Sequence, residues 1–363
     1  MRTVICSPGF LVAATIMLTL VVVEMVFRLA APQYHNFVQP DDTIGYSLVP
    51  GSRYLFFPPE NCPGWRSSGT INTHGLRDRD YPYRKEPGTF RILALGDSYT
   101  EGLQFELDKT WTKLLEQRLN KDGSVVKYEV INAGKSGMGT GTEFLYYMNE
   151  GWKYNADLVL VLFIPNDVSD NSPELSHALQ PYFHVSAGEL VLDNSFSHSS
   201  SYRLRKVLNR LARASYLFEF ARKMYAEREP RLRVVTQDRL PKEESAIEVT
   251  QALYRALSRA AVQHGSQFAV AIGTSHDESV WTDDNSKLND LTSRANEVMA
   301  GFFEREQLHY VNLRPVLKAF STEHAAIIHG CAENGRRGHW TEVAHTVAAD
   351  ALYKFLKPSQ AVM

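Results

Sequence analysis

Short apolar runs alternate with amphipathic stretches through the larger, second part of the chain. Five runs have the length and the branched apolar residues of buried parallel strands; they lie at 91–97, 128–134, 157–167, 267–273 and 309–313. Five stretches between and after them place apolar residues at helical spacing; they lie at 110–120, 142–154, 246–264, 289–307 and 345–356. Strands and helices in this order predict an α/β fold built on a doubly wound parallel sheet.

The alternation stops between about 168 and 245, where the pattern predicts a helical insertion. The spacing within 202–225 predicts one or two amphipathic helices, with an apolar face formed by Leu204, Val207, Leu208, Leu211 and Phe218. Residues 201–233 contain ten Lys or Arg and three Asp or Glu. This basic insertion has two interpretations. It is a solvated face over an apolar stripe, or it contacts anionic lipid head groups or an anionic glycan.

The N-terminus contains the most apolar segment of the chain. Residues 9–23 carry no charge, and 9–30 spans twenty-two residues with Glu24 and Arg28 near one end. A helix needs about 20 apolar residues to cross a bilayer. The segment is an uncleaved signal anchor, a cleaved signal peptide or a buried core helix. Because Leu29 stands where a cleavage site requires a small residue, we assign 1–31 as a transmembrane signal anchor.

Either a signal anchor or a cleaved signal peptide would export the rest of the chain. We then expect a periplasmic or extracytoplasmic domain, held at the membrane through 9–30 or secreted after cleavage. Residues 32–87, rich in Pro, Tyr and Gly, are predicted to be an extended segment packed on an α/β domain at 88–363. In an oxidising compartment, Cys62 and Cys331 either pair or stay free.

Composition and charge exclude several classes of protein. A hydrophobic content of 44% is enough for a sizeable core, which excludes a disordered chain. The net charge of −2 removes the general electrostatic argument for nucleic-acid binding. The twelve histidines show no spacing typical of metal ligands, so we predict no metal and no cofactor.

Three predicted strands are followed by residues that suit acyl transfer. Ser98, Gly134 and Asn166 follow the first, second and third strands. Ligands of open α/β sheets bind outside the carboxyl ends of the strands, so these residues can converge on one crevice. Ser98 offers a hydroxyl nucleophile. The backbone N–H of Gly134, which a substrate can approach closely, and the side-chain amide of Asn166 can donate hydrogen bonds to a developing oxyanion. His339 is the candidate base, whereas His345 is interpreted as a structural or capping residue of the last helix.

These residues resemble the four sequence blocks of the SGNH (GDSL-type) hydrolases over roughly 88–357. The blocks are Gly96-Asp97-Ser98, Gly134, Asn166-Asp167 and the segment around His339, and Asn72–Asp78 is similar to a further stretch of a membrane-anchored bacterial-type subgroup. The resemblance implies a flavodoxin-like three-layer fold and the cleavage or transfer of ester groups. It also implies Ser98 as nucleophile, His339 as general base, and an oxyanion hole formed by the Ser98 N–H, the Gly134 N–H and the Asn166 amide.

The chain departs from the family pattern just before His339. The family has an Asp two or three residues before the catalytic His, and this chain has Arg336 and Arg337 there. Losing the orienting carboxylate costs on the order of 10⁴ in rate in a serine protease triad. Three alternatives follow: Glu333 supplies the carboxylate, a backbone carbonyl holds the imidazole in a Ser–His dyad, or the enzyme is impaired.

The leading hypothesis is an exported, membrane-anchored serine esterase or O-acyltransferase. Its substrate would be an ester-bearing small molecule or polysaccharide, with O-acetyl groups of a cell-envelope polysaccharide favoured. The alternative is a catalytically weak module of the same fold that binds a glycan or a protein partner.

Overall fold

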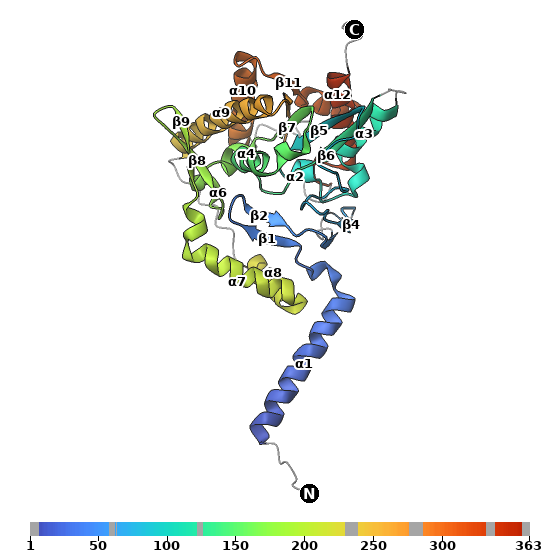
Figure 1. Ribbon diagram of the computed structural model, residues 1–363, viewed down its shortest axis with the longest axis vertical. Helices are drawn as coiled ribbons and strands as arrows, with labels where there is room; N and C mark the ends of the chain where they lie inside the picture. The colour runs from blue at the N-terminus through green and yellow to red at the C-terminus, as the bar shows by residue number, and fades with distance from the viewer. Residues whose placement is uncertain are drawn as a thin grey trace.

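A five-stranded parallel sheet forms the centre of the molecule (Figure 1). The computed structural model describes residues 7–57, 62, 64–121, 126–228, 239–275, 286–331 and 338–357. The spatial order of the strands is β6, β5, β7, β10, β11, and every neighbouring pair is parallel. Their bounds are Thr89–Leu95 for β5, Lys127–Asn132 for β6, Leu158–Phe163 for β7, Gln267–Ile272 for β10 and His309–Asn312 for β11. This is the flavodoxin-like order, so the predicted fold class is confirmed.

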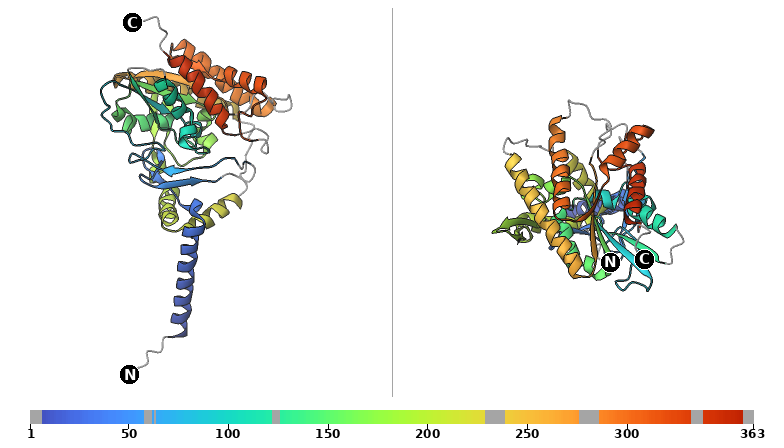
Figure 2. Two further views of the ribbon diagram at one scale, coloured as in Figure 1. Left: turned by 90° about the vertical axis from the view of Figure 1, so that its right-hand side faces the viewer. Right: turned by 90° about the horizontal axis from the view of Figure 1, so that it is seen from above.

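Helices cover both faces of the sheet and give the fold its three layers (Figure 2). One face packs against α4 (Thr140–Asn149), α9 (Arg239–Gln263) and α10 (Ser286–Arg305). The other packs against α3 (Trp111–Lys121), α11 (Arg314–His324) and α12 (Glu342–Leu356). The sequence pattern did not predict α11, because its apolar face is short and Pro315 stands in its first turn, where proline is tolerated.

The strand sequences explain why both faces are buried. Along β5, Leu93 and Leu95 enter one core, whereas Ile92 and Ala94 enter the other. All six residues of the central strand β7 are buried. A strand buried on both faces shows a continuous apolar run rather than alternation, as the sequence of β7 does.

The insertion after β7 contains a hairpin as well as helices. It comprises α5 (Asn166–Asp170), α6 (Pro173–Ser176), β8 (Tyr182–Ser186), β9 (Glu189–Asp193), a 3-10 turn (Ser195–His198), α7 (Ser200–Ala214) and α8 (Tyr216–Arg228). The helices α7 and α8 correspond to the predicted amphipathic stretch. The hairpin was not predicted, because its strands are five residues long and mostly exposed. Helix α9 begins at Arg239, inside the predicted insertion.

The segment before the sheet forms two small antiparallel pairs on the domain. These are β1 (Val38–Asp41) with β2 (Gly45–Leu48), and β3 (Arg53–Phe56) with β4 (Ser67–Thr70). Cys62, which precedes β4, forms a disulfide with Cys331 in the loop before α12. The paired alternative for these cysteines is therefore confirmed. Short helical turns complete the chain: η1 (Pro32–Tyr34), α2 (Ser98–Glu101), η2 (Leu107–Lys109) and η3 (Gly151–Tyr154).

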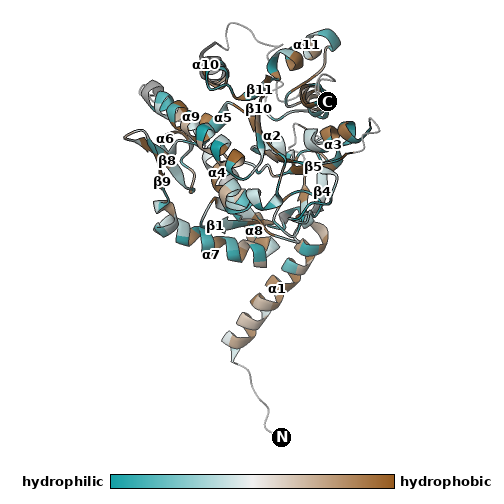
Figure 3. Ribbon diagram, turned by 45° about the horizontal axis from the view of Figure 1, so that its top comes forward, coloured by the Kyte–Doolittle hydropathy of each residue, from teal (hydrophilic) through white to brown (hydrophobic). Residues whose placement is uncertain are grey.

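Helix α1 (Pro8–Ala30) projects away from the domain, and none of its residues is buried (Figures 1 and 3). Its hydropathy of 2.5 over an 18-residue window makes it the one helix, among the described residues, that is long and apolar enough to cross a membrane. A signal sequence passes the same test. Near its end, Glu24 accepts hydrogen bonds from the backbone N–H groups of Tyr216 and Leu217, which fixes the start of α8 on α1.

Candidate active site

The candidate site lies where the order of the sheet reverses. The chain leaves β5 toward the edge strand β6 and then crosses back to β7, on the other side of β5. This is a topological switch point, at which open α/β sheets place ligands outside the carboxyl ends of the strands. Ser98 follows β5, Gly134 follows β6 and Asn166 follows β7, so the topology brings the three predicted residues to one edge.

Ser98 begins the four-residue helix α2 directly after a tight turn. The turn requires Gly96, whose φ is +151° and where a Cβ atom would come within 2.2 Å of the Thr100 hydroxyl. Asp97 caps the helix, because its carboxylate accepts a hydrogen bond from the Tyr99 N–H at 2.9 Å. As the first residue of α2, Ser98 has no intrahelical acceptor for its own N–H. The turn therefore presents both the hydroxyl and the N–H of Ser98 at the sheet edge.

His339 lies against Ser98, although 241 residues separate them in the chain. The distance from His339 Nε2 to Ser98 Oγ is 2.8 Å. An antiparallel bridge between His329 and Trp340 closes the loop that carries His339, and the Tyr99 hydroxyl donates a hydrogen bond to the Gly338 carbonyl. A serine hydroxyl within hydrogen-bond distance of an imidazole nitrogen is the geometry that an activated serine nucleophile requires.

Burial lowers the pKa of His339 below its ordinary value of 6.5. The ring lies 5.1 Å from the Tyr99 ring and 6.3 Å from the Trp65 ring, measured between centroids. A neutral imidazole can accept the Ser98 proton, so this pKa shift keeps the base competent at mildly acidic pH.

We therefore expect the acid limb of the pH profile of kcat/KM to have its midpoint below pH 6.5. The sign follows from the depressed pKa, because His339 stays neutral until the pH falls through that lower value. The measurement is ester hydrolysis between pH 4 and 8. A midpoint near 7 would contradict the assignment and point instead to Asp97, whose pKa burial raises to about 7.

Gly134 and Asn166 both make hydrogen bonds within the free protein. The Gly134 N–H donates to Asn132 Oδ1 at 3.1 Å. Asn166 Nδ2 donates to Asp97 Oδ2 at 2.8 Å and to Asp170 Oδ2 at 3.1 Å. Gly134 also has no room for a side chain, since a Cβ atom would lie 2.5 Å from the Glu101 nitrogen. The two groups stand at the predicted edge, while their roles as oxyanion donors stay predictions.

The candidate for the third member of a triad, Glu333, lies outside the described residues. Glu333, Arg336 and Arg337 fall within 332–337, which the structure does not describe. No described residue accepts a hydrogen bond from Nδ1 of His339. The choice among Glu333, a backbone carbonyl and an impaired site therefore stays open. In the described part of the chain, no group of three or more His, Cys, Asp or Glu residues is arranged to hold a metal ion.

Two groups around the site were not assigned roles by the sequence pattern. Arg77 is buried and donates hydrogen bonds to the carbonyls of Glu101 and Gly102 at 2.7 and 3.2 Å, at the end of α2. Asn132 donates to the Thr100 carbonyl and accepts from Gly134, so it links α2 to the end of β6. The Asn72–Asp78 motif was the available signal for Arg77, but it did not reveal what the side chain contacts.

His345 is structural, as its position suggested. It is buried in the first turns of α12, and its Nδ1 accepts a hydrogen bond from the Trp111 N–H at 3.3 Å. Burial lowers its pKa to about 3, so it stays neutral at physiological pH.

A parallel α/β sheet with a serine and a histidine in contact at its switch point is the arrangement expected of an α/β hydrolase. The chain belongs to the GDSL-like lipase/acylhydrolase family, whose model matches residues 94–346. Membership supports hydrolase activity. No curated protein matches the chain by sequence.

Three solved structures illustrate the similarity. An acetyl xylan esterase is 12% identical to this chain. The match covers 74% of this chain and 100% of the esterase, with a TM-score of 0.42. A catalytic mutant of an acetylxylan esterase from Geobacillus stearothermophilus is 13% identical, with coverage of 73% and 93% and a TM-score of 0.42. An alpha/beta hydrolase enzyme from the metagenome of Lake Arreo, Spain, is 13% identical, with coverage of 75% and 96% and a TM-score of 0.42.

Proposed function

We propose that this protein is an exported, membrane-anchored serine esterase or O-acyltransferase that acts on O-acetyl groups of a cell-envelope polysaccharide. The contact of 2.8 Å between His339 Nε2 and Ser98 Oγ carries the proposal of ester chemistry. Family membership supports it. The apolar helix α1 and the Cys62–Cys331 disulfide support an exported, anchored chain, because disulfides persist in oxidising compartments.

In the proposed reaction, Ser98 Oγ attacks the ester carbonyl while His339 Nε2 takes its proton. The carbonyl oxygen becomes an oxyanion that the N–H groups of Ser98 and Gly134 and the amide of Asn166 stabilise. His339 then gives its proton to the departing alcohol, which leaves an acyl group on Ser98. Water in an esterase, or a sugar hydroxyl in a transferase, attacks this acyl group with His339 again as base.

The oxyanion donors need to change partners during this reaction. Gly134 and Asn166 donate to Asn132, Asp97 and Asp170 in the free protein. Catalytic hydrogen bonds often reach their final geometry only when the substrate is bound. Burial raises the pKa of Asp170 to about 6, so its carboxyl group is still mainly ionised at neutral pH and accepts the Asn166 hydrogen bond as a carboxylate.

Covalent labelling with a fluorophosphonate tests the proposal, because the probe reacts only with an activated serine hydroxyl. The full chain in nonionic detergent is expected to become labelled, with the label on the peptide that contains Ser98. Ser98→Ala should abolish the labelling, whereas Ser186→Ala, at an exposed serine on β8, should not change it. A wild-type chain that resists the probe would instead support a binding module with little catalytic activity.

A further inference from the structure

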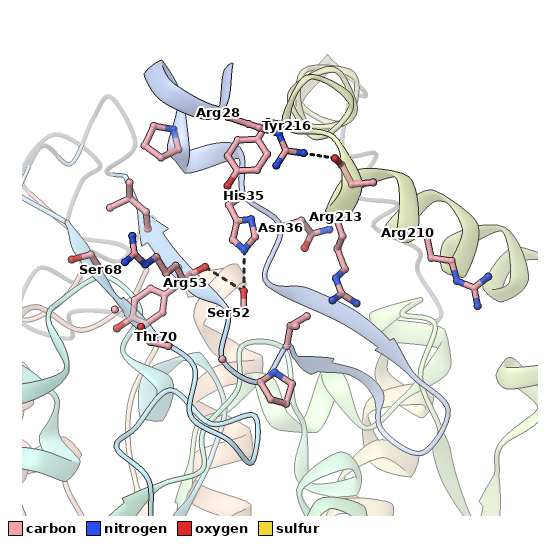
Figure 4. Close-up of a pocket in the computed structure, with 18 residues that line it drawn as sticks. Arg28, His35, Asn36, Ser52, Arg53, Ser68, Thr70, Arg210, Arg213 and Tyr216 are labelled. Atoms are coloured by element: carbon pink, nitrogen blue, oxygen red, sulfur yellow. Dashed lines mark hydrogen bonds between the residues drawn. The ribbon is translucent and has the colours of Figure 1, made fainter. Parts of the chain in front are cut away.

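A cavity lies at the junction of α1 with the domain, separate from the candidate active site (Figure 4). Its volume is about 1060 Å³. Its walls come from the end of α1, the segment through η1 to Asn36, the β3–β4 pair and the helices α7 and α8. Neither Ser98 nor His339 lines it. We refer to it as the junction pocket.

The junction pocket is strongly cationic. Four arginines line it, one from α1, one from β3 and two from α7: Arg28, Arg53, Arg210 and Arg213. His35 lines it too, and no Asp or Glu is among its lining residues. Burial lowers the pKa of His35, and the positive charges of Arg213 and Arg28 lower it further. No acidic residue lines the pocket, and among the described residues only Arg28 is neutralised, by Glu24 outside the pocket lining.

Three of the four arginines have no charged partner in the described part of the chain. The side chains of Arg53 and Arg210 make no ion pair or hydrogen bond there, and both residues are exposed. Among the described residues, Arg213 donates only to the neutral amide oxygen of Gln39, at 3.3 Å. Arg28 is paired with Glu24. Guanidinium groups bind phosphate oxygens through paired hydrogen bonds, so each unpaired arginine offers donors to a phosphate group.

The pocket stands at the level where α1 would leave a membrane. Arg28 lies in the last turn of α1 and donates a hydrogen bond to the Ala214 carbonyl at the end of α7, at 2.6 Å. Helices α7 and α8 lie on the side of the domain from which α1 projects (Figures 1 and 2). The apolar stripe predicted on α7 is exposed, with Leu204, Val207 and Leu211 at 57, 53 and 47%. Basic amphipathic helices with such stripes lie in the membrane interface.

We propose that the junction pocket binds the phosphate-bearing headgroup of an anionic membrane lipid, whose acyl chains extend beside α1. The proposal rests on the anchoring of the chain in a membrane and not on the chemistry at Ser98. The volume is at the upper end of the range of small-molecule sites, which leaves room for a glycerophosphate. The hydroxyl groups of Ser52, Ser68 and Thr70 line the same pocket and can bind the glycerol or phosphate oxygens.

A bound lipid would fix the domain relative to the membrane surface. The pocket joins α1 to α7 and to the β3–β4 pair, so a headgroup that bridges its arginines connects all three. Tyr54 lines the pocket and also accepts a hydrogen bond from Arg77, which in turn contacts the end of α2. The lipid site and the helix that carries Ser98 are thus joined by a short chain of contacts.

Native mass spectrometry of the full chain, released from nonionic detergent, tests the proposal. Phosphatidylglycerol and phosphatidylcholine are added in equal amounts, and adducts of phosphatidylglycerol are expected to dominate. Each arginine near an anionic lipid changes affinity by about fivefold, so Arg53→Ala with Arg213→Ala should weaken phosphatidylglycerol binding by roughly 25-fold. Arg203→Ala, an exposed arginine of α7 outside the pocket, is the matched control and should leave binding unchanged.

Several outcomes would overturn the proposal. The first is equal amounts of phosphatidylglycerol and phosphatidylcholine adducts. The second is a loss of phosphatidylglycerol binding by Arg203→Ala as large as the loss by the pocket variant. The third is displacement of phosphatidylglycerol by soluble glycerol 1-phosphate at the same affinity, which would indicate a site for free phosphate. Arg210→Ala alone changes an exposed side chain with no described partner, so a loss of lipid binding in this variant is not a folding effect.

The measurement also separates this proposal from the proposed function. Ser98→Ala is expected to bind phosphatidylglycerol like the wild type even if the esterase proposal fails. The measured mass shows directly whether α1 is retained, and a chain without α1 would overturn both the anchoring and the lipid site.

Discussion

Replacing Ser98 by alanine is expected to lower kcat for ester hydrolysis by on the order of 10⁴-fold or more, without loss of stability. The Ser98 hydroxyl contacts His339 Nε2 at 2.8 Å, and removing it leaves no atom to form the acyl-enzyme. The side chain supports only this described hydrogen bond, so the melting temperature should stay within experimental error. The measurement is steady-state hydrolysis of 4-nitrophenyl acetate by the full chain in detergent, with Ser186→Ala as the control.

The same experiment with His339 shows whether the two residues act as a unit. His339→Ala should lower kcat by a similar factor, and the double variant should be no worse than either single variant, because such effects are not additive. If wild type and Ser98→Ala hydrolyse the ester equally slowly, the esterase proposal fails and the binding-module alternative is favoured.

The inner strands of the sheet were predicted well because both of their faces are buried. Strand β7 lies at the centre of the sheet, so its sequence is an unbroken apolar run that predicts a strand without knowledge of its neighbours. The hairpin β8–β9 lies at the surface, where few residues need to be apolar. Its strands therefore give little apolar signal, and the remaining local signal is the two-residue turn at Ala187 and Gly188.

The site shows the same division between local and long-range information. The turn through Gly96 and Asp97 is a local feature, and its glycine and capping residue can be recognised from the sequence. The approach of His339 to Ser98 depends on packing across the whole sheet; the position of His339 before the last helix made it a candidate, and the resemblance to a known family gave it the role of base. The hydrogen-bond acceptors of the Gly134 N–H and the Asn166 amide could not be predicted, because several nearby oxygen atoms can accept from the same donor.

Arg77 illustrates a motif residue whose role becomes clear only in three dimensions. It is 1% exposed, yet no carboxylate pairs with it in the described part of the chain. Its guanidinium donates instead to the Tyr54 hydroxyl and to the carbonyls of Glu101, Gly102 and Phe105. Carbonyls at the C-terminal end of a helix carry partial negative charge, which stabilises this buried cation at the end of α2.

Arg77→Met is therefore expected to destabilise the protein by about 3–5 kcal/mol, because several buried oxygens lose their donor at once. Activity should also fall, since the end of the helix that begins with Ser98 loses its support. Arg77→Lys should rescue little, because a single ammonium group cannot reproduce the planar set of donors. Urea denaturation followed by tryptophan fluorescence measures the change in unfolding free energy.

Arg79→Met provides the matched control two positions along the chain. The side chain of Arg79 is 47% exposed and pairs with Glu116 near the surface, so its loss should cost less than about 1 kcal/mol. Equal destabilisation by the two variants would contradict the role assigned to Arg77. A stable Arg77→Met chain with unchanged kcat would show that the end of α2 holds its position without the guanidinium. It would also show that the contacts from the junction pocket through Arg77 do not affect catalysis at Ser98.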